Sequence, residues 1–235
     1  KRVNNDKIGI TGISWGGVLT SIAIGYDNRF SFAIPVYGTA YLGDGFRNFM
    51  DFDNEYVDAL WGAAHNLDNA KMPTLWLTYN QDHAFEIPMY VKPYQHTKPF
   101  NSKNVLAMLG DWGHSHGGGW SKPHSHAFAN WITYGKGGFV TFETQPSGTN
   151  VNCKVNIPQG TDKATLSADL YYVKKSIAMG AEWTVKKSFF KFDKDTGVIT
   201  GTIPDEAVGY YIQINFRSDG SPCNSSSVYV EIPLY

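Results

Sequence analysis

Ser14 stands at the centre of the segment Gly12-Ile13-Ser14-Trp15-Gly16, which has the pattern Gly-x-Ser-x-Gly. An apolar run precedes this pattern and a helix-forming stretch follows it. Such a segment is typical of a nucleophile elbow, a strained turn that lifts a serine hydroxyl above the edge of a sheet. Glycines two residues to either side let the strand and the helix pass each other closely. The pattern predicts that Ser14 is a nucleophile for acyl transfer, with an ordinary structural turn as the alternative.

Trp15 would supply a backbone N–H at the N-terminus of the helix that follows the elbow. Unpaired N–H groups and the helix dipole favour a negative charge at such a position. We therefore expect the N–H of Trp15 to bind the oxyanion that forms when Ser14 attacks a carbonyl group.

Asp82 is the predicted acid that would orient the base of this serine. It comes shortly after the apolar segment Trp76-Leu77-Thr78-Tyr79. A loop at the carboxyl end of such a strand would aim a side chain at the site. A solvated aspartate in a turn is the alternative interpretation, and Asp111 is a substitute acid if Asp82 does not serve.

Two histidines compete for the role of the base in the segment from Gly110 to Trp120. The glycines of this segment predict a flexible loop that can carry an imidazole to Ser14. His116 is the preferred base because it lies closer to the glycine-rich run and to the helix expected after it. His114, which is nearer the end of the preceding strand, is the alternative base.

The same histidines allow a metal interpretation, because His114-x-His116 and His124-x-His126 resemble pairs of ligands when Asp82 or Asp111 is added. Residues i and i+2 of a helix do not share a face, however, and His124 and His126 are expected on or beside a helix. We therefore expect no metal and no other cofactor.

The elements that must position these residues alternate between strands and helices from Lys7 to about Gly135. This pattern predicts a parallel sheet flanked by helices. The expected strands are Lys7–Thr11, Ser31–Val36, Thr74–Thr78 and Val105–Leu109, and the expected helices are Gly17–Tyr26, Asn54–Trp61, Ile87–Tyr94 and Lys122–Tyr134.

The composition changes at Gly135-Lys136-Gly137-Gly138. Short β-branched and aromatic runs follow, separated by turn-forming clusters, and they predict an immunoglobulin-like antiparallel β-sandwich. We place the domain boundary so that residues 1–137 and 138–235 form separate units. The expected strands of the second unit are Phe139–Thr144, Val151–Ile157, Ala164–Val173, Trp183–Phe192, Gly197–Ile203, Gly209–Phe216 and Ser227–Ile232.

The overall composition is that of a globular protein, with 42% hydrophobic residues, 17% charged residues and a net charge of -1. The absence of a basic stripe argues against nucleic-acid binding. The absence of a run of ~18 apolar residues argues against a membrane span. Cys153 and Cys223 have neither a metal nor a redox spacing, so a disulfide and two buried thiols both stay open.

With these motifs in place, the chain resembles an acetylxylan-esterase-like α/β-hydrolase that has a β-sandwich attached to its C-terminus. The segments that carry this resemblance are Lys7-Ile8-Gly9-Ile10-Thr11-Gly12-Ile13-Ser14-Trp15-Gly16-Gly17, Phe32-Ala33-Ile34-Pro35-Val36-Tyr37-Gly38, Asn80-Gln81-Asp82-His83-Ala84-Phe85 and His114-Ser115-His116-Gly117-Gly118-Gly119-Trp120.

The resemblance implies a catalytic triad of Ser14, Asp82 and His116 (or His114), with Trp15 as one oxyanion donor. It also implies a serine esterase that acts on acetyl esters of a small molecule or a carbohydrate, and a periplasmic or secreted location. A serine peptidase of the acylaminoacyl type shares the elbow and the triad order. A truncated, non-catalytic remnant whose sandwich is a binding module is a further alternative.

In the family that the chain resembles, the elbow follows about half of the hydrolase domain. We therefore expect the first half of that domain, including the loop with the second oxyanion donor, to be supplied by another segment or chain. Four aromatic residues are candidate walls of the substrate pocket, although ordinary core or lid packing is the alternative for each: Tyr37, Trp61, Phe85 and Trp120.

Overall fold

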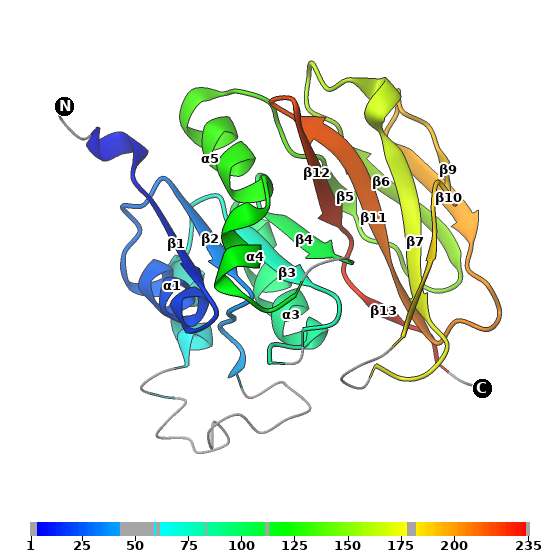
Figure 1. The fold of residues 1–235 in the computed structure, drawn as a ribbon, viewed down its shortest axis with the longest axis horizontal. Helices are drawn as coiled ribbons and strands as arrows, with labels where there is room; N and C mark the ends of the chain where they lie inside the picture. The colour runs from blue at the N-terminus through cyan, green and yellow to red at the C-terminus, as the bar shows by residue number, and fades with distance from the viewer. Residues whose placement is uncertain are drawn as a thin grey trace.

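The computed structural model describes residues 4–42, 59, 62–82, 84–110, 113–177 and 182–233. Its first part is built around a parallel sheet of four strands in the order β1-β2-β3-β4, so that the strand order follows the chain (Figure 1). All residues of β3 and β4 are buried, as expected for parallel strands that are covered on both faces. The strands are β1 (Gly9–Ile13), β2 (Phe32–Val36), β3 (Leu75–Tyr79) and β4 (Val105–Leu109).

Helices follow each of these strands. α1 packs on β1 and β2, α3 packs on β3 and β4, and α5 contacts β2. The helix expected at Asn54–Trp61 lies almost entirely outside the described residues. The helical elements are η1 (Asn5–Lys7), α1 (Trp15–Tyr26), η3 (Ala63–Asn69), α3 (Ile87–Thr97), η4 (Lys98–Phe100), α4 (His116–Ser121) and α5 (His124–Tyr134).

The second part consists of two antiparallel sheets. One has the order β5-β6-β10-β9 and the other β12-β11-β7-β8, with β13 beside β11. The predicted order of an α/β part followed by a β-rich part is therefore confirmed, whereas the immunoglobulin-like topology stays a prediction. The elements are β5 (Thr141–Thr144), β6 (Asn150–Asn156), η5 (Lys163–Thr165), β7 (Ser167–Val173), β8 (Trp183–Lys186), β9 (Lys191–Phe192), β10 (Val198–Thr202), β11 (Gly209–Ser218), β12 (Ser221–Ser226) and β13 (Val230–Glu231).

In this part, one strand prediction is wrong and one strand was not predicted. The run Trp183–Phe192 forms β8 and β9, which belong to different sheets, because Ser188 adopts a φ of 48° and redirects the chain. The N–H of Ser188 donates to Asp169 Oδ1 over 2.7 Å, which fixes this turn. β12 was not predicted, because its sequence Ser-Pro-Cys-Asn-Ser-Ser lacks the apolar alternation by which strands are recognised.

β12 covers the outer edge of β4 and so joins the two parts (Figure 1). The N–H of Met108 donates to Ser226 Oγ over 3.0 Å. A second link runs from Asn80 Nδ2 to the Tyr211 hydroxyl, also over 3.0 Å. The predicted boundary near residue 137 falls in the connection between α5 and β5.

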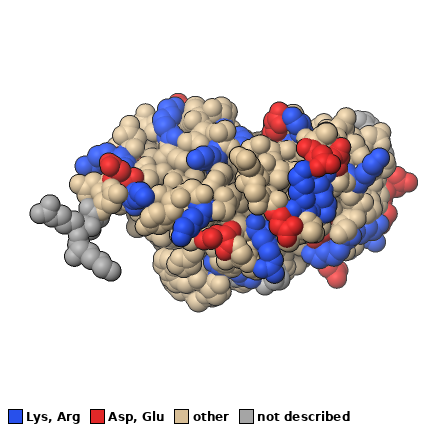
Figure 2. All heavy atoms as spheres, turned by 90° about the horizontal axis from the view of Figure 1, so that it is seen from above, with Lys and Arg blue, Asp and Glu red and all other residues tan. Residues whose placement is uncertain are grey.

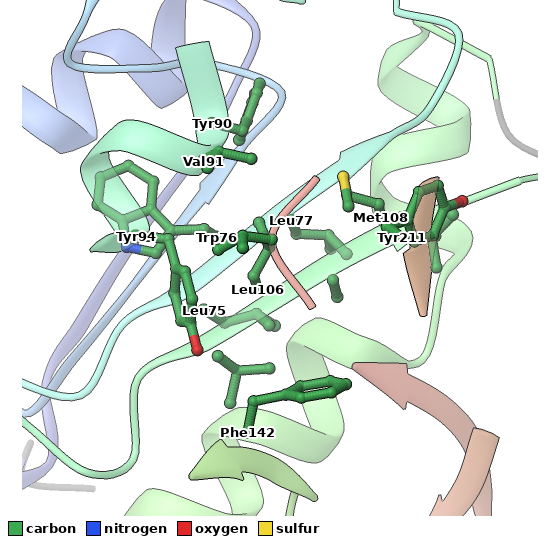
Figure 3. Packing of buried hydrophobic residues seen from close by; sticks show 14 of the residues in the cluster. Leu75, Trp76, Leu77, Tyr90, Val91, Tyr94, Leu106, Met108, Phe142 and Tyr211 are labelled. Carbon is green, nitrogen blue, oxygen red and sulfur yellow. The ribbon is translucent and has the colours of Figure 1, made fainter. Parts of the chain in front are cut away.

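The hydrophobic core also continues across this joint. Figure 3 shows Leu75, Trp76, Leu77 and Leu106 of β3 and β4 beside Tyr90, Val91 and Tyr94 of α3, with Phe142 and Tyr211 from the β-rich part nearby. All of these side chains belong to one cluster of buried residues. The sheet that carries the candidate site is therefore held by α3 together with the β-rich part.

Charged side chains of both signs are interspersed on the face that Figure 2 shows, in keeping with the small net charge. Within the part of the chain that the structure describes, no helix is long and apolar enough to cross a membrane.

Cys153 and Cys223 are both buried and are not joined to each other. Of the two alternatives left open by the sequence, the structure has the free thiols. Burial raises the pKa of each thiol to about 12. Because the thiolate is the reactive form of cysteine, both side chains are chemically silent at neutral pH while the protein is folded.

We therefore expect no reaction of the folded protein with a thiol reagent such as dithionitrobenzoate at pH 8. In guanidinium chloride both thiols should react, and the Cys153→Ala variant should lose half of that signal. A rapid reaction of either thiol in the folded protein, or the lack of free thiol after unfolding, would contradict this account.

Candidate active site

Ser14 lies between the end of β1 and the start of α1, with φ 58° and ψ -120°. Residues other than glycine rarely adopt a positive φ, and they keep it only where the surroundings hold the backbone in place. The N–H of Ser14 donates to the carbonyl of Val36 over 3.0 Å, and its carbonyl accepts from Gly17 over 2.8 Å and from Val18 over 3.1 Å. The backbone on both sides of Ser14 is therefore tied, and the geometry is that of the expected elbow.

Glycines let the strand and the helix approach each other closely at Ser14, but not all of the glycines that the sequence indicated do so. A Cβ atom on Gly12 would lie 2.1 Å from the carbonyl oxygen of Gly16, and one on Gly38 would lie 2.3 Å from the carbonyl oxygen of Ser14. A Cβ on Gly16 would meet nothing within 4 Å. The expectation that Gly12 and Gly16 serve the same steric purpose is therefore wrong, since Gly16 is the neighbour for which Gly12 makes room.

A continuous hydrogen-bonded chain joins Ser14 to His114 and to Asp82. The distance from Ser14 Oγ to His114 Nε2 is 2.9 Å. On the other side of the ring, His114 Nδ1 lies 3.1 Å from Asp82 Oδ2 and 3.3 Å from Oδ1. With the imidazole proton on Nδ1 facing the carboxylate, Nε2 is the acceptor for the hydroxyl of Ser14.

The preference for His116 is corrected by this arrangement. Residues His116–Ser121 form the helix α4 rather than a flexible loop, and His116 is an exposed residue at its start. Ser115 caps the helix by accepting a hydrogen bond from the N–H of Gly118 over 2.9 Å. The imidazole that contacts Ser14 is therefore that of His114, the residue just before the N-cap Ser115.

Asp82 is buried, and its orientation is fixed by its own turn. Its Oδ1 accepts from the N–H of Ala84 over 2.8 Å and from that of Phe85 over 2.9 Å. These bonds leave Oδ2 directed at the imidazole of His114, with which it forms the shorter of the two contacts. The solvated turn considered as an alternative for Asp82 is thereby excluded.

The aromatic residues expected as pocket walls have other surroundings. Tyr37 and Phe85 are buried, and their rings pack against His114 at centroid distances of 4.4 Å and 5.9 Å. They support the imidazole instead of facing an open pocket. Trp120 lies on α4 with 55% of its surface exposed, and Trp61 lies outside the described residues.

The N–H of Trp15 lies at the N-terminus of a helix, as expected for a donor to an oxyanion. Trp15 is the first residue of α1, so no carbonyl of the helix can accept from its N–H. The side chain of Trp15 is 43% exposed. This donor therefore lies at the start of α1, in the residue next to Ser14.

The metal interpretation finds no support in the histidine pairs. Among the described residues, no three His, Cys, Asp or Glu side chains are grouped so that they could hold a metal ion. The Nε2 of His124 accepts from the N–H of Asn224 over 2.9 Å, which makes this histidine part of the joint between the two parts. His126 is exposed, and Asp111 lies outside the described residues.

No family model matches the chain, and no curated protein matches it. Among solved structures, it is similar to acylaminoacyl peptidase of Pyrococcus horikoshii, with 23% identity over 48% of this chain and 21% of that one, and a TM-score of 0.41. An acylaminoacyl peptidase in complex with Z-Gly-Gly-Phe-chloromethyl ketone gives 20% identity over the same shares and a TM-score of 0.42. A Pyrococcus furiosus esterase gives 14% identity over 46% of each chain and a TM-score of 0.35. The chain thus spans about a fifth of the length of the peptidases and about half that of the esterase.

The steric environment of the elbow glycines predicts opposite effects of two alanine substitutions. Gly16→Ala should raise the free energy of unfolding by about 0.5–1 kcal/mol, because it adds a helix former to α1 where nothing obstructs a Cβ. Gly12→Ala should lower it by about 1–3 kcal/mol, because its Cβ meets a backbone carbonyl that must shift.

Urea unfolding of the two variants beside the unsubstituted chain measures both effects. Equal stability of the two variants would contradict the tight packing of the elbow.

Proposed function

We propose that this chain carries the nucleophile, the base and the acid of a serine hydrolase. The single observation that supports this most is the unbroken chain from Ser14 Oγ through His114 to Asp82, with contacts of 2.9 Å and 3.1 Å. A serine hydroxyl is a weak nucleophile unless an adjacent base takes its proton, and the base in turn needs an orienting group. Ser14 would be the nucleophile, His114 the base and Asp82 the orienting group.

In the first half of the reaction, Ser14 Oγ bonds to the carbonyl carbon of the substrate while its proton moves to His114 Nε2. The carboxylate of Asp82 stabilises the imidazolium, and the N–H of Trp15 donates to the oxyanion. The tetrahedral intermediate collapses when the bond to the leaving group breaks, and the leaving group takes the proton from Nε2. Water then attacks the acyl-enzyme by the same route and releases the acid.

The substrate class follows from the resemblance alone: an acetyl ester of a small molecule or a carbohydrate. An acylaminoacyl-type peptidase would use the same three residues, with an amide nitrogen as the leaving group in place of an ester oxygen. The ratio of kcat/KM on an acetyl ester to kcat/KM on an acylated amino-acid amide separates the two functions.

A non-catalytic remnant is the alternative outside the enzymes. Backbone strain of the kind seen at Ser14 costs about 1–3 kcal/mol. Loss of function would remove the reason to keep both this strain and a carboxylate–imidazole–hydroxyl chain. The unbroken chain of contacts from Ser14 to Asp82 therefore favours a catalytic site over a non-catalytic remnant.

We also propose that a further portion of sheet, from another segment or chain, lies against β1. Ile8, Trp15, Leu19, Tyr26 and Tyr134 are between 39% and 69% exposed. Three of them follow one face of α1, and the ring of Tyr134 lies 4.4 Å from the Nζ of Lys7, just before β1. Among the described strands, β1 pairs with β2 alone. A strand edge beside an apolar surface is a site for association with further protein. We call these five residues the β1 surface.

Labelling with a fluorophosphonate tests the hydrolase proposal and the choice of base. The chain should be labelled on Ser14, and Ser14→Ala should remove the label. His114→Ala should slow the labelling by a factor of at least about 10³, because triad members act as a unit.

His116→Ala is the matched control. It also removes an imidazole, but from an exposed position at the start of α4, two residues after His114. It should be labelled at the rate of the unsubstituted chain. Loss of labelling in His116→Ala with retention in His114→Ala would reverse the assignment, and labelling that survives Ser14→Ala would refute the nucleophile.

The β1 surface predicts that the isolated chain associates at micromolar concentration. The double variant Leu19→Lys/Tyr26→Lys should sediment as a smaller species, because two charges disrupt the apolar surface. Val185→Lys, which changes an exposed apolar residue on β8, should behave like the unsubstituted chain. A monodisperse monomer of the unsubstituted chain would contradict the proposed association.

A further inference from the structure

Tyr37 has a strained backbone like that of Ser14, and it lies at the end of the neighbouring strand. It follows directly after β2 with φ 28° and is completely buried. Its N–H donates to the carbonyl of Leu77 over 2.7 Å. The residues on either side touch the elbow, since the carbonyl of Val36 accepts from the N–H of Ser14, and Gly38 packs against the carbonyl of Ser14. The position of Tyr37 relative to the nucleophile is therefore fixed through the backbone.

The side chain of Tyr37 reaches the segment that carries the base. Its hydroxyl donates to the carbonyl of Ser115, the residue next to His114. Its ring lies 4.4 Å from the ring of His114, with an angle of 39° between the planes. A Cβ on Gly119 would lie 2.9 Å from the same hydroxyl, so the phenol also abuts the helix one turn further on. Tyr37 thus touches both the imidazole and the helix behind it.

The helix α4 needs such an anchor because its own sequence stabilises it poorly. Three of its residues are Gly117, Gly118 and Gly119. Each glycine costs about 1 kcal/mol relative to alanine in a helix, and a helix this short is unstable by itself. The cap at Ser115 and the Tyr37 hydroxyl are therefore needed to keep this segment in one conformation.

We infer that Tyr37 is a positioning residue that holds His114 within hydrogen-bond reach of Ser14. This inference rests on the proposed hydrolase function and adds to it how the base is kept in place. Tyr37 itself is buried behind the imidazole, so it does not touch the substrate.

The chemistry of the phenol suits this role. Burial raises the pKa of Tyr37, so its hydroxyl remains protonated at neutral and moderately alkaline pH and keeps donating to Ser115. The anchor is therefore constant over the pH range in which an imidazole changes charge.

The test compares Tyr37→Phe with the unsubstituted chain. This substitution keeps the ring beside His114 and removes only the hydrogen bond to Ser115. Fluorophosphonate labelling of Ser14, expressed per folded molecule, should slow about three- to tenfold, which is the effect of one lost hydrogen bond. With p-nitrophenyl acetate, kcat should fall by the same factor while KM stays unchanged.

A matched control variant keeps the test decisive. Tyr94→Phe removes another buried hydroxyl, whose contact is Gln145 Nε2 at 3.4 Å, and should be labelled at the unsubstituted rate.

The outcomes separate this inference from the proposed function. Labelling of Tyr37→Phe at the unsubstituted rate overturns the positioning role, even if its melting temperature falls, because a purely structural residue leaves the rate per folded molecule unchanged. An unsubstituted chain that takes no label on Ser14 overturns the hydrolase proposal, and the positioning role with it.

Discussion

The close approach of three backbone segments at Ser14 is the constraint on which the rest of the site depends. The end of β1, the start of α1 and the end of β2 meet there, with the N–H of Ser14 bonded to Val36 and its carbonyl to Gly17 and Val18. The positive φ of Ser14 costs about 1–3 kcal/mol, and these hydrogen bonds hold it in place. Without room at Gly12 and Gly38, the segments would separate and the hydroxyl of Ser14 would no longer be held within reach of His114.

The parallel sheet brings the other groups to this point without long connections. Because the strand order follows the chain, β1 to β4 end side by side. Their carboxyl ends lead to Ser14, Tyr37, Asp82 and His114 in turn. Ligand sites of parallel sheets lie beyond these strand ends for the same reason. The positions of Ser14, Tyr37 and Asp82 therefore follow directly from the sheet topology. Only His114 lies on a longer connection, between β4 and α4.

That difference explains how much the sequence could predict. The elbow at Ser14 and the carboxylate of Asp82 follow from local patterns, a glycine-flanked serine and an acid after a buried strand. The histidine that contacts Ser14 could not be chosen in this way, because glycines in His116–Ser121 indicate a loop, whereas a cap at Ser115 and the phenol of Tyr37 make the segment helical. β12 escaped prediction for a similar reason, since tertiary contacts rather than its composition make it a strand.

The β-rich part contributes to the candidate site through the segment that carries His114. At the start of this segment, Gly110 lies against the ring of Tyr171 from β7, where a Cβ would be 2.7 Å from a ring carbon. At its end, the Nε2 of His124 accepts from the N–H of Asn224 in β12. Both ends of the connection that carries His114 are thus attached to the five-stranded sheet, while its middle is held by Tyr37. Since a shift of His114 by about 1 Å would break its contact with Ser14, the position of His114 depends on the β-rich part as well as on Tyr37.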